Sequence, residues 1–364
     1  MVASNEISGS ARRPPRRRVR VCYFNTWAGP LEEAARYLAR VPALDLRPLV
    51  ADARDGELLR KARLDCDWYA ENARCFAAMQ HEEIEFLPAW VTGRAGILDL
   101  AKAPRAPGEE RWLVTMAHQP QALAPLAGKT FALLAKFGVR HLFYAFDEAS
   151  RFMPCFSEIA PHLDALIHDE GPLDPAHVGK LKPGCVTRHR SWVANLLPAA
   201  AEFNPAPESK IYFLGSEMGL TANRRQQIAF LQDKFKDRFV ASYDHSTPVN
   251  GRAALNRYKV GLCPEGRKFG TPAMSATHTD RPFWSGCLGM VPVSEDSAAG
   301  GRLEELHRAG LIVRYANSDL KALERACEEA LAMPDEARRK IYDHFNAHET
   351  VGTVTAAAIA AAGV

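Results

Sequence analysis

The chain has 364 residues, of which 47% are hydrophobic and 24% are charged, and its formal net charge is +3. These values are typical of a folded globular protein and exclude a disordered, collagen-like or coiled-coil chain. So small a charge also gives no sign of nucleic-acid binding. The length suggests two domains or one large one.

Residues 1–17 are polar and rich in Ser, Gly, Pro and Arg, which predicts a disordered basic leader. Six arginines lie between Arg12 and Arg20, so the rest of the chain is slightly acidic. The leader is either a solvated tail or an arm for an anionic lipid surface or a polyanionic acceptor. The arginines considered for peripheral contact with an anionic surface are Arg12, Arg13, Arg16, Arg17 and Arg18.

The eight cysteines are scattered, with no C-x-x-C pair, and this usage predicts a reducing compartment rather than a disulfide framework or a zinc knuckle. The N-terminus has no apolar core after its basic residues, so a signal peptide is not expected. No apolar run reaches the 18 residues that indicate a spanning helix. The sequence therefore predicts a soluble, cytoplasmic protein.

After the leader, short apolar strands alternate with amphipathic stretches, the pattern of an α/β fold with parallel strands. Helices are expected at 31–40 and 128–137 in the first half and at 222–235 and 320–332 in the second. The predicted strands of the first half are 18–24, 46–51, 84–87, 112–116, 141–146 and 165–168. Those of the second half are 210–214, 239–242, 258–262, 290–293 and 311–315.

Residues 197–209 contain three prolines and no strand pattern, and we interpret them as a linker. The chain is thus expected to form two facing Rossmann-like domains with a cleft between them, at 18–200 and 205–345. The helical stretch 335–348 and the Ala-rich end follow, and residues 346–364 are expected to form a C-terminal helix or tail.

Open parallel sheets bind ligands beyond the carboxyl ends of their strands. Polar residues follow nearly every predicted strand, although any strand end that meets water shows this. The chain has no G-x-G-x-x-G after its first strand, no P-loop, no G-x-S-x-G and no H-E-x-x-H. A dinucleotide-dependent dehydrogenase and a P-loop enzyme are therefore disfavoured.

The segment 258–296 predicts a buried strand, a loop rich in Gly, Pro, Thr and Ser, a short helix opened by Arg281, and a second strand. A guanidinium and free helix-start amides suit a diphosphate. The hydroxyls of Thr277 and Thr279, with amides near Gly270, would complete such a cradle. The alternative is that Arg281 caps its helix or pairs locally with Asp280 or Asp296.

The pattern Arg281-x-Phe283-x5-Gly289-x2-Pro292-Val293, preceded by Tyr258-x4-Cys263-Pro264-x-Gly266, resembles the donor region of exostosin-like glycosyltransferases. It is also similar to spore-maturation-type glycosyltransferases and, more loosely, to fucosyltransferases. The resemblance is strong over about 40 residues and loose over about 140. It implies the GT-B architecture, with a nucleotide-sugar donor in the C-terminal domain and the acceptor largely in the N-terminal one. It also implies that the segment 346–364 crosses back to the N-terminal domain.

The resemblance also implies individual roles. A basic residue near the donor diphosphate is expected after Gly215 and Ser216, at Arg224 or Arg225. Many relatives carry an acidic residue for the ribose where this chain has Trp284, which is a departure from the family pattern. Either Glu295 or Asp296 would contact the ribose instead, or the resemblance extends to the fold alone. The full expected donor set is Arg281, Gly215, Ser216, Arg224, Arg225, Thr279, Glu265 (at the nucleobase edge) and Asp296.

An inverting glycosyltransferase needs a general base in the N-terminal domain. The expected bases are Asp147 or Glu148 and then His118, while Asp169 and Glu170 are further candidates. A retaining enzyme would need no such base, and capping or structural roles remain open for these residues. Trp27, with Asn25 and Thr26, would contact the acceptor, Trp27 by stacking on a sugar face, with core packing as its alternative.

The implied reaction moves a sugar from a nucleoside diphosphate to the hydroxyl of a carbohydrate, protein or other acceptor. No metal or cofactor is expected, since arginines would meet the diphosphate charge and the chain has no D-x-D motif. Two other functions stay open. They are a sugar-nucleotide epimerase of the same architecture and a non-catalytic two-Rossmann protein that binds a small molecule.

Overall fold

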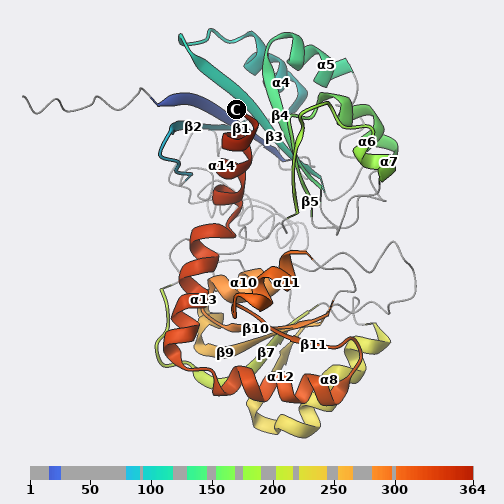
Figure 1. Cartoon of the computed structure of the whole chain (residues 1–364), viewed down its shortest axis with the longest axis vertical. Coiled ribbons are helices and arrows are strands. Elements are labelled where there is room, and N and C mark those ends of the chain that lie inside the picture. The colour runs from blue at the N-terminus through green and yellow to red at the C-terminus, as the bar shows by residue number, and fades with distance from the viewer. Residues whose placement is uncertain are drawn as a thin grey trace, which may run out of the picture.

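The computed structural model describes residues 16–25, 79–90, 93–117, 129–145, 153–168, 175–189, 202–215, 221–243, 253–264, 281–296 and 301–363. Within them the chain forms two parallel β-sheets, one in each half of the sequence (Figure 1). Helices pack on both sheets, so the predicted fold class, α/β with two Rossmann-like units, is confirmed.

The first sheet has the order β2-β1-β3-β4-β5-β6, and all its described pairings are parallel. Its strands are β1 (Arg17–Asn25), β2 (Ile84–Trp90), β3 (Glu109–Ala117), β4 (Val139–Ala145), β5 (Ala165–His168) and β6 (Val186–His189). The described helices of this half are α4 (Gly93–Lys102), α5 (Lys129–Lys136), α6 (Met153–Ile159) and α7 (Pro175–Val178).

The second sheet has the order β11-β10-β9-β7-β8 and is also parallel. Its strands are β7 (Glu208–Leu214), β8 (Phe239–Ser242), β9 (Tyr258–Cys263), β10 (Val291–Glu295) and β11 (Val313–Tyr315). The helices around it are α8 (Ala222–Phe235), α10 (Arg281–Cys287), α11 (Arg302–Arg308), α12 (Leu320–Ala332) and α13 (Asp335–His348).

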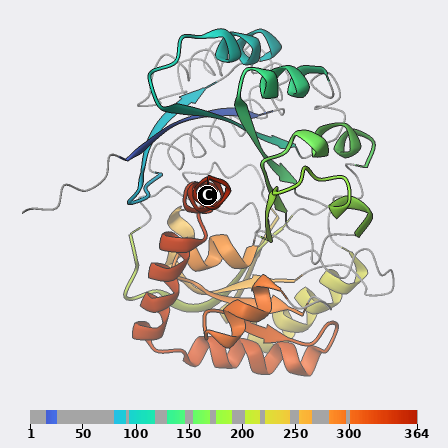
Figure 2. The same ribbon diagram turned by 45° about the horizontal axis from the view of Figure 1, so that its top comes forward.

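The last helix, α14 (Val351–Ala362), follows α13 but packs on the first sheet (Figures 1 and 2). The Tyr144 hydroxyl, near the end of β4, donates to the Val351 carbonyl at 3.2 Å, and Arg140, near the start of β4, donates to the Ala362 carbonyl. The helix therefore runs antiparallel to β4 along one sheet face. The opposite face of β4 buries Phe143 against α5.

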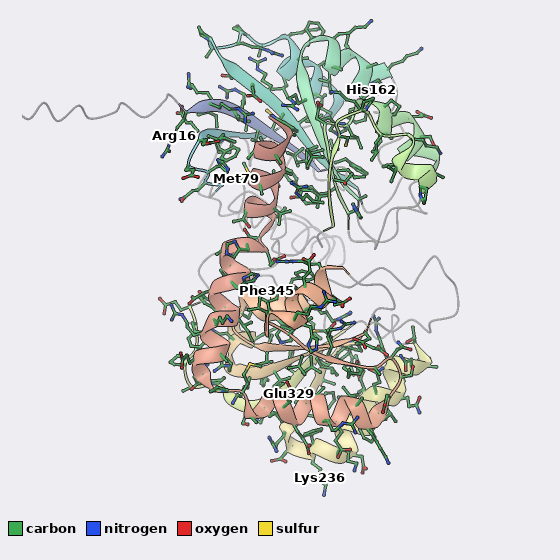
Figure 3. All side chains as sticks on the ribbon, in the orientation of Figure 1. Arg16, Met79, His162, Lys236, Glu329 and Phe345 are labelled. Atoms are coloured by element: carbon green, nitrogen blue, oxygen red, sulfur yellow. The ribbon has the colours of Figure 1, made fainter. Side chains whose placement is uncertain are left out.

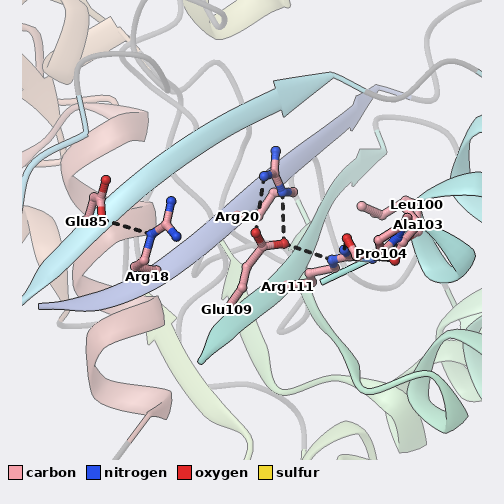
Figure 4. A network of polar contacts seen from close by, with 8 residues as sticks. All are labelled: Arg18, Arg20, Glu85, Leu100, Ala103, Pro104, Glu109 and Arg111. Carbon is pink, nitrogen blue, oxygen red and sulfur yellow. Dashed lines mark hydrogen bonds and ion pairs between the residues drawn. The ribbon is translucent and has the colours of Figure 1, made fainter. Parts of the chain in front are cut away.

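A buried ionic network lies toward the amino ends of β1 and β3 (Figure 4). Arg111 donates to the carbonyl of Leu100 at 2.6 Å and to that of Ala103 at 2.8 Å, which satisfies the carboxyl end of α4. Glu109 accepts from Arg111 and from Arg20, each at 3.0 Å. Hydrogen bonds from Arg20, with the charge and hydrogen bond of Arg111, lower the pKa of Glu109 to about 2.

Most predicted elements within the described residues are confirmed, several with their bounds: β5, β8, α8, α12 and α13. The structure adds β6, which the sequence analysis missed, because Val186–His189 is a short, mostly polar strand at the sheet edge, paired only with β5 in the described part. The predicted strand 46–51 and helix 31–40 lie outside the described residues.

No helix in the described part of the chain is long and apolar enough to cross a membrane. Five cysteines are free in that part, and four of them are buried: Cys22, Cys263, Cys287 and Cys327. The four buried cysteines pack as small apolar residues of the core.

Candidate functional site

The strand order of the second sheet marks a topological switch point between β7 and β9. The chain passes from β7 to β8 on one side and then crosses to β9, β10 and β11 on the other. In such sheets the crevice for a ligand opens outside the carboxyl ends of the two strands at the switch point. Leu214 ends β7, and Pro264 directly follows β9.

Arg281 lies at this switch point. It is the first residue of α10, as the sequence predicted, and its Nε donates to the Leu214 carbonyl at 3.0 Å. Its guanidinium carbon lies 5.7 Å from the centre of the Phe213 ring. The alternative pairing with Asp296 is wrong, because Asp296 forms its ion pair with Arg314 at 2.5 Å. Asp280 lies outside the described residues.

Arg224, in the first turn of α8, contacts the end of β9. Its Nε donates to the Pro264 carbonyl at 3.2 Å, and its backbone N–H donates to the Thr221 hydroxyl, which caps α8. The neighbouring Arg225 is exposed to solvent. Two permanently charged guanidiniums from α8 and α10 thus bind carbonyls at the ends of β9 and β7.

Gly215 has a packing role beside the switch point. A Cβ on this residue would lie 2.3 Å from a carbon of the Phe213 ring, so no larger residue fits without moving that ring. Its backbone N–H donates to the Ser242 carbonyl of β8 at 3.0 Å. The glycine lets the ring that faces Arg281 pack against the chain as it leaves β7.

A buried polar network connects the end of β10 to α8, the helix that carries Arg224. Oε1 of Glu295, the last residue of β10, accepts from the side-chain amides of Asn223 and Gln227 in α8, at 3.1 and 2.9 Å. It also accepts from the side chain of Asn317 and the backbone N–H of Ser318, at 2.8 and 2.9 Å. This carboxylate joins β10, the start of α8 and the segment before α12.

The sequence analysis did not identify Asn223, Gln227 or Asn317. An available signal was the spacing of Asn223 and Gln227, which are four residues apart and therefore share one face of α8. The network also argues against the expected ribose role of Glu295, because this residue is 0% exposed and its Oε1 bonds four protein donors. Asp296 is partly exposed, but it is engaged with Arg314.

The first sheet has a switch point of the same kind, between β1 and β3. Asn25 ends β1 and pairs with Met116 of β3, which itself ends at Ala117. The other expected acceptor and catalytic residues lie outside the described residues: Thr26, Trp27, His118, Asp147, Glu148, Asp169 and Glu170. So do Ser216, Glu265 and Thr279 of the expected donor set, and Thr277 of the expected phosphate cradle.

The first strand begins within the predicted leader, at its last residue. Arg17 and Arg18 belong to β1, where Arg17 pairs with Glu110 at 2.8 Å and Arg18 with Glu85 at 3.1 Å. Both are therefore parts of the sheet, which corrects the predicted leader boundary at residue 17. Arg16 is exposed, and Arg12 and Arg13 lie outside the described residues.

No family model and no curated protein matches the sequence. Among solved structures, the spinosyn rhamnosyltransferase SpnG complexed with thymidine diphosphate is 13% identical, with 93% of this chain and 98% of that one covered and a TM-score of 0.39. AviGT4, a glycosyltransferase involved in avilamycin A biosynthesis, is 11% identical over 95% and 96%, with a TM-score of 0.44.

The α,α-trehalose-phosphate synthase (UDP-forming) from Burkholderia vietnamiensis is 13% identical over 96% of this chain and 100% of that one, with a TM-score of 0.42. Identities and TM-scores as low as these do not assign a function. The function of this chain is therefore argued from its own residues.

Proposed function

We propose that the protein is a glycosyltransferase that moves a sugar from a nucleoside-diphosphate sugar to a hydroxyl acceptor. The observation that carries the proposal is the placement of Arg281 and Arg224 on either side of the switch point between β7 and β9. Each is tied to a strand-end carbonyl, at 3.0 and 3.2 Å, by its Nε. The terminal N–H groups of such a fork are the ones that suit phosphate oxygens.

The charge of this edge fits a diphosphate better than a neutral ligand. Both guanidiniums stay charged at any physiological pH. Glu295, a fully buried acid of β10, accepts from the side-chain amides of α8, and Asp296 is paired with Arg314. Two permanently charged guanidiniums therefore lie at the carboxyl ends of β7 and β9, where a diphosphate would bind.

Transfer, rather than binding alone, is supported by the second switch point. A ligand crevice is expected outside the carboxyl ends of β1 and β3, and the residues that follow the strands of this sheet in sequence include the candidates for acceptor contact and for the base. The resemblance around Arg281 and Phe283 points to the same chemistry. In this reading the second sheet holds the donor and the first sheet holds the acceptor.

The reaction then follows from the charges. The acceptor oxygen forms a bond to the anomeric carbon, the bond from that carbon to the diphosphate breaks, and the nucleoside diphosphate leaves with the electron pair. Arg281 and Arg224 would stabilise the charge that grows on the leaving group. In an inverting enzyme Asp147 or Glu148, and failing these His118, would accept the proton of the acceptor hydroxyl. The proposal includes no metal.

The proposal is tested by thermal unfolding of the full chain with a panel of UDP, GDP, dTDP and CMP and their sugar conjugates. One nucleoside diphosphate is expected to raise the melting temperature in a saturable way, because a ligand that binds only the folded state stabilises it. If none of them does, the proposal fails. Product analysis without an acceptor separates transfer from epimerisation, since an epimerase converts the donor sugar by itself.

We also propose a cellular location for the enzyme and a role for its basic leader. The enzyme would act in the cytoplasm, and Arg12, Arg13 and Arg16 would contact an anionic surface peripherally. Deletion of residues 1–15 leaves β1 intact, because the described strand begins at Arg17. The deletion is expected to lower sedimentation with vesicles that contain anionic lipid at low salt, and unchanged sedimentation would remove the leader from this role.

A further inference from the structure

A groove of about 720 Å³ lies beside α14, away from the two switch points. It is lined by Gln80 and His81, just before β2, by Arg188 of β6, and by the end of α13 with the residues that join it to α14. Figure 2 looks along α14 and shows the two halves of the molecule on either side of it. The volume lies in the range of roughly 300–1,000 Å³ that small-molecule sites occupy.

The floor of the groove is an apolar face made of very small side chains. Ala357, Ala360 and Ala361 of α14 line it, with Thr353 one turn earlier on the same face. Ala357 is exposed, so the face has no complete protein cover. Methyl groups at this spacing leave a flat surface on which an alkyl chain or a ring can lie.

The rim of the groove carries a positive charge, at Arg188, that forms no ion pair with a carboxylate in the described part of the chain. Arg188 is half-buried and donates only to the adjacent Thr187 carbonyl, at 3.0 Å, with no carboxylate partner among the described residues. His81 accepts at Nδ1 from the Glu83 backbone N–H at 3.2 Å, which makes its Nε2 the donor. An anion in the groove would therefore find donors without displacing an existing ion pair.

Among the described residues that line the groove, the one carboxylate already has a cationic partner. Glu349 is buried and forms an ion pair with Arg302, and His344 Nε2 lies 3.6 Å from the same carboxylate oxygen. His348, also in the lining, lies beside His344, with ring centres 4.9 Å apart and ring planes inclined by 53°. The groove thus combines an apolar floor, an unpaired guanidinium and imidazole donors.

We infer that this groove binds an amphipathic anion, a small molecule with one carboxylate or phosphate group and an alkyl or aryl body. The anionic group pairs with Arg188 and the imidazole donors, and the apolar body covers the alanine face of α14. The ligand contacts residues of both halves of the chain. The site does not depend on the proposed transferase reaction, because none of its lining residues lies at the end of β7 or β9.

The test is isothermal titration of the full chain with octanoate and octyl phosphate, below their micelle concentrations. Inorganic phosphate and 1-octanol are the matched probes for the head and the body alone. Both amphipathic anions are expected to bind with one-to-one stoichiometry. Each of the two partial probes is expected to bind at least about tenfold more weakly, because charge-assisted hydrogen bonds and apolar burial both contribute. Equal binding of 1-octanol would overturn the role of the charge.

Two variants locate the site. Ala357→Trp fills the floor and is expected to abolish binding, and Arg188→Gln is expected to weaken it about tenfold. Ala229→Trp and Arg325→Gln make the same changes at exposed positions of α8 and α12 and serve as controls. Circular dichroism confirms that each variant is folded. The inference is wrong if both amphipathic anions bind the two groove variants as tightly as they bind the wild type. It is also wrong if neither anion binds the wild-type protein at millimolar concentration.

Discussion

Arg281 donates from Nε to the backbone carbonyl of Leu214 at 3.0 Å, which ties the first residue of α10 to the last residue of β7. A guanidinium that is anchored by Nε keeps its terminal N–H groups in a fixed plane. The bond therefore orients the charge at the switch point before any ligand arrives. This preorganisation is what a site for a diphosphate leaving group requires.

The first prediction is that Arg281→Ala weakens binding of the nucleoside diphosphate found in the panel by about 10- to 100-fold. A charge-assisted hydrogen bond contributes roughly 1.5–3 kcal/mol, and each 1.4 kcal/mol is a factor of ten. Isothermal titration measures the change, and Arg325→Ala, an exposed arginine on α12, is the control. Unchanged affinity in Arg281→Ala would remove this residue from the donor site while leaving the fold assignment intact.

The second prediction concerns the buried carboxylate behind the arginines. Glu295→Ala leaves four donors without their acceptor, and an unsatisfied buried group costs about 1–3 kcal/mol. The free energy of unfolding is therefore expected to fall by at least about 3 kcal/mol in urea titrations. The neighbouring Asp296→Ala removes a partly exposed ion pair and should cost less than about 1 kcal/mol. Equal losses in both variants would contradict the network.

The third prediction is a pH dependence that originates at Glu109. Its pKa is about 2 in the folded protein, below the ordinary value of about 4.3 for the unfolded chain. The carboxylate therefore stabilises the fold above about pH 4.3, and this contribution disappears as the pH falls toward 2. Two pKa units correspond to up to about 3 kcal/mol.

Glu109→Gln should accordingly be less stable than the wild type at pH 7, and the difference should shrink between pH 5 and pH 2.5. Urea unfolding at each pH measures it. Glu85→Gln is the control, since Glu85 pairs with Arg18 at an exposed site where an ion pair contributes little. A difference that stays constant with pH would show that the charge of Glu109 is not its source.

The fourth prediction tests the contact between α10 and α13. A Cβ at Gly286 would lie 2.5 Å from two carbons of the Phe345 ring, which is fully buried (Figure 3). Gly286→Ala is expected to lower the free energy of unfolding by about 1–3 kcal/mol, since overpacking a tight core displaces its side chains. Gly179→Ala, where the new Cβ meets its nearest atom at 3.4 Å, should change stability little.

The fifth prediction follows from the proposal that no metal takes part. Once a donor and acceptor pair is found, EDTA is expected to leave the initial rate of transfer unchanged, because arginine side chains carry the charge compensation that a metal would supply. Added Mg²⁺ or Mn²⁺ should not restore or raise the rate. A loss of activity in EDTA that Mn²⁺ reverses would contradict the proposal.

Local patterns were sufficient to predict the long helices. The bounds of α8 and α12 agree with the prediction, because Thr221 and Asp319 cap them with side-chain oxygens, a signal that is local in sequence. Edge strand β6 was missed for the opposite reason. It has a single aliphatic residue, Val186, and it is a strand because β5 lies beside it.

The sequence likewise identified some residues of the candidate site but not their contacts. The sequence identified Arg281 as the residue that opens a short helix, and it identified Arg224 as a basic residue after the strand that ends at Leu214. As the alternative to a diphosphate it offered a helix cap or an ion pair of Arg281 with Asp280 or Asp296, because sequence alone does not show which strands lie side by side. Arg314, from the adjacent strand β11, pairs with Asp296 instead.

The amino-acid sequence was sufficient to predict two α/β units and an arginine that opens a short helix in the second. Periodicity, caps and turn residues act over a few neighbouring positions, so they can be recognised in the sequence. The contact of that arginine with the end of β7, the four donors to Glu295 and the packing of α14 on the first sheet are seen only in the tertiary structure. These contacts depend on the order of the strands and on residues as far apart in sequence as Arg140 and Ala362. They form because folding buries the faces of the two sheets.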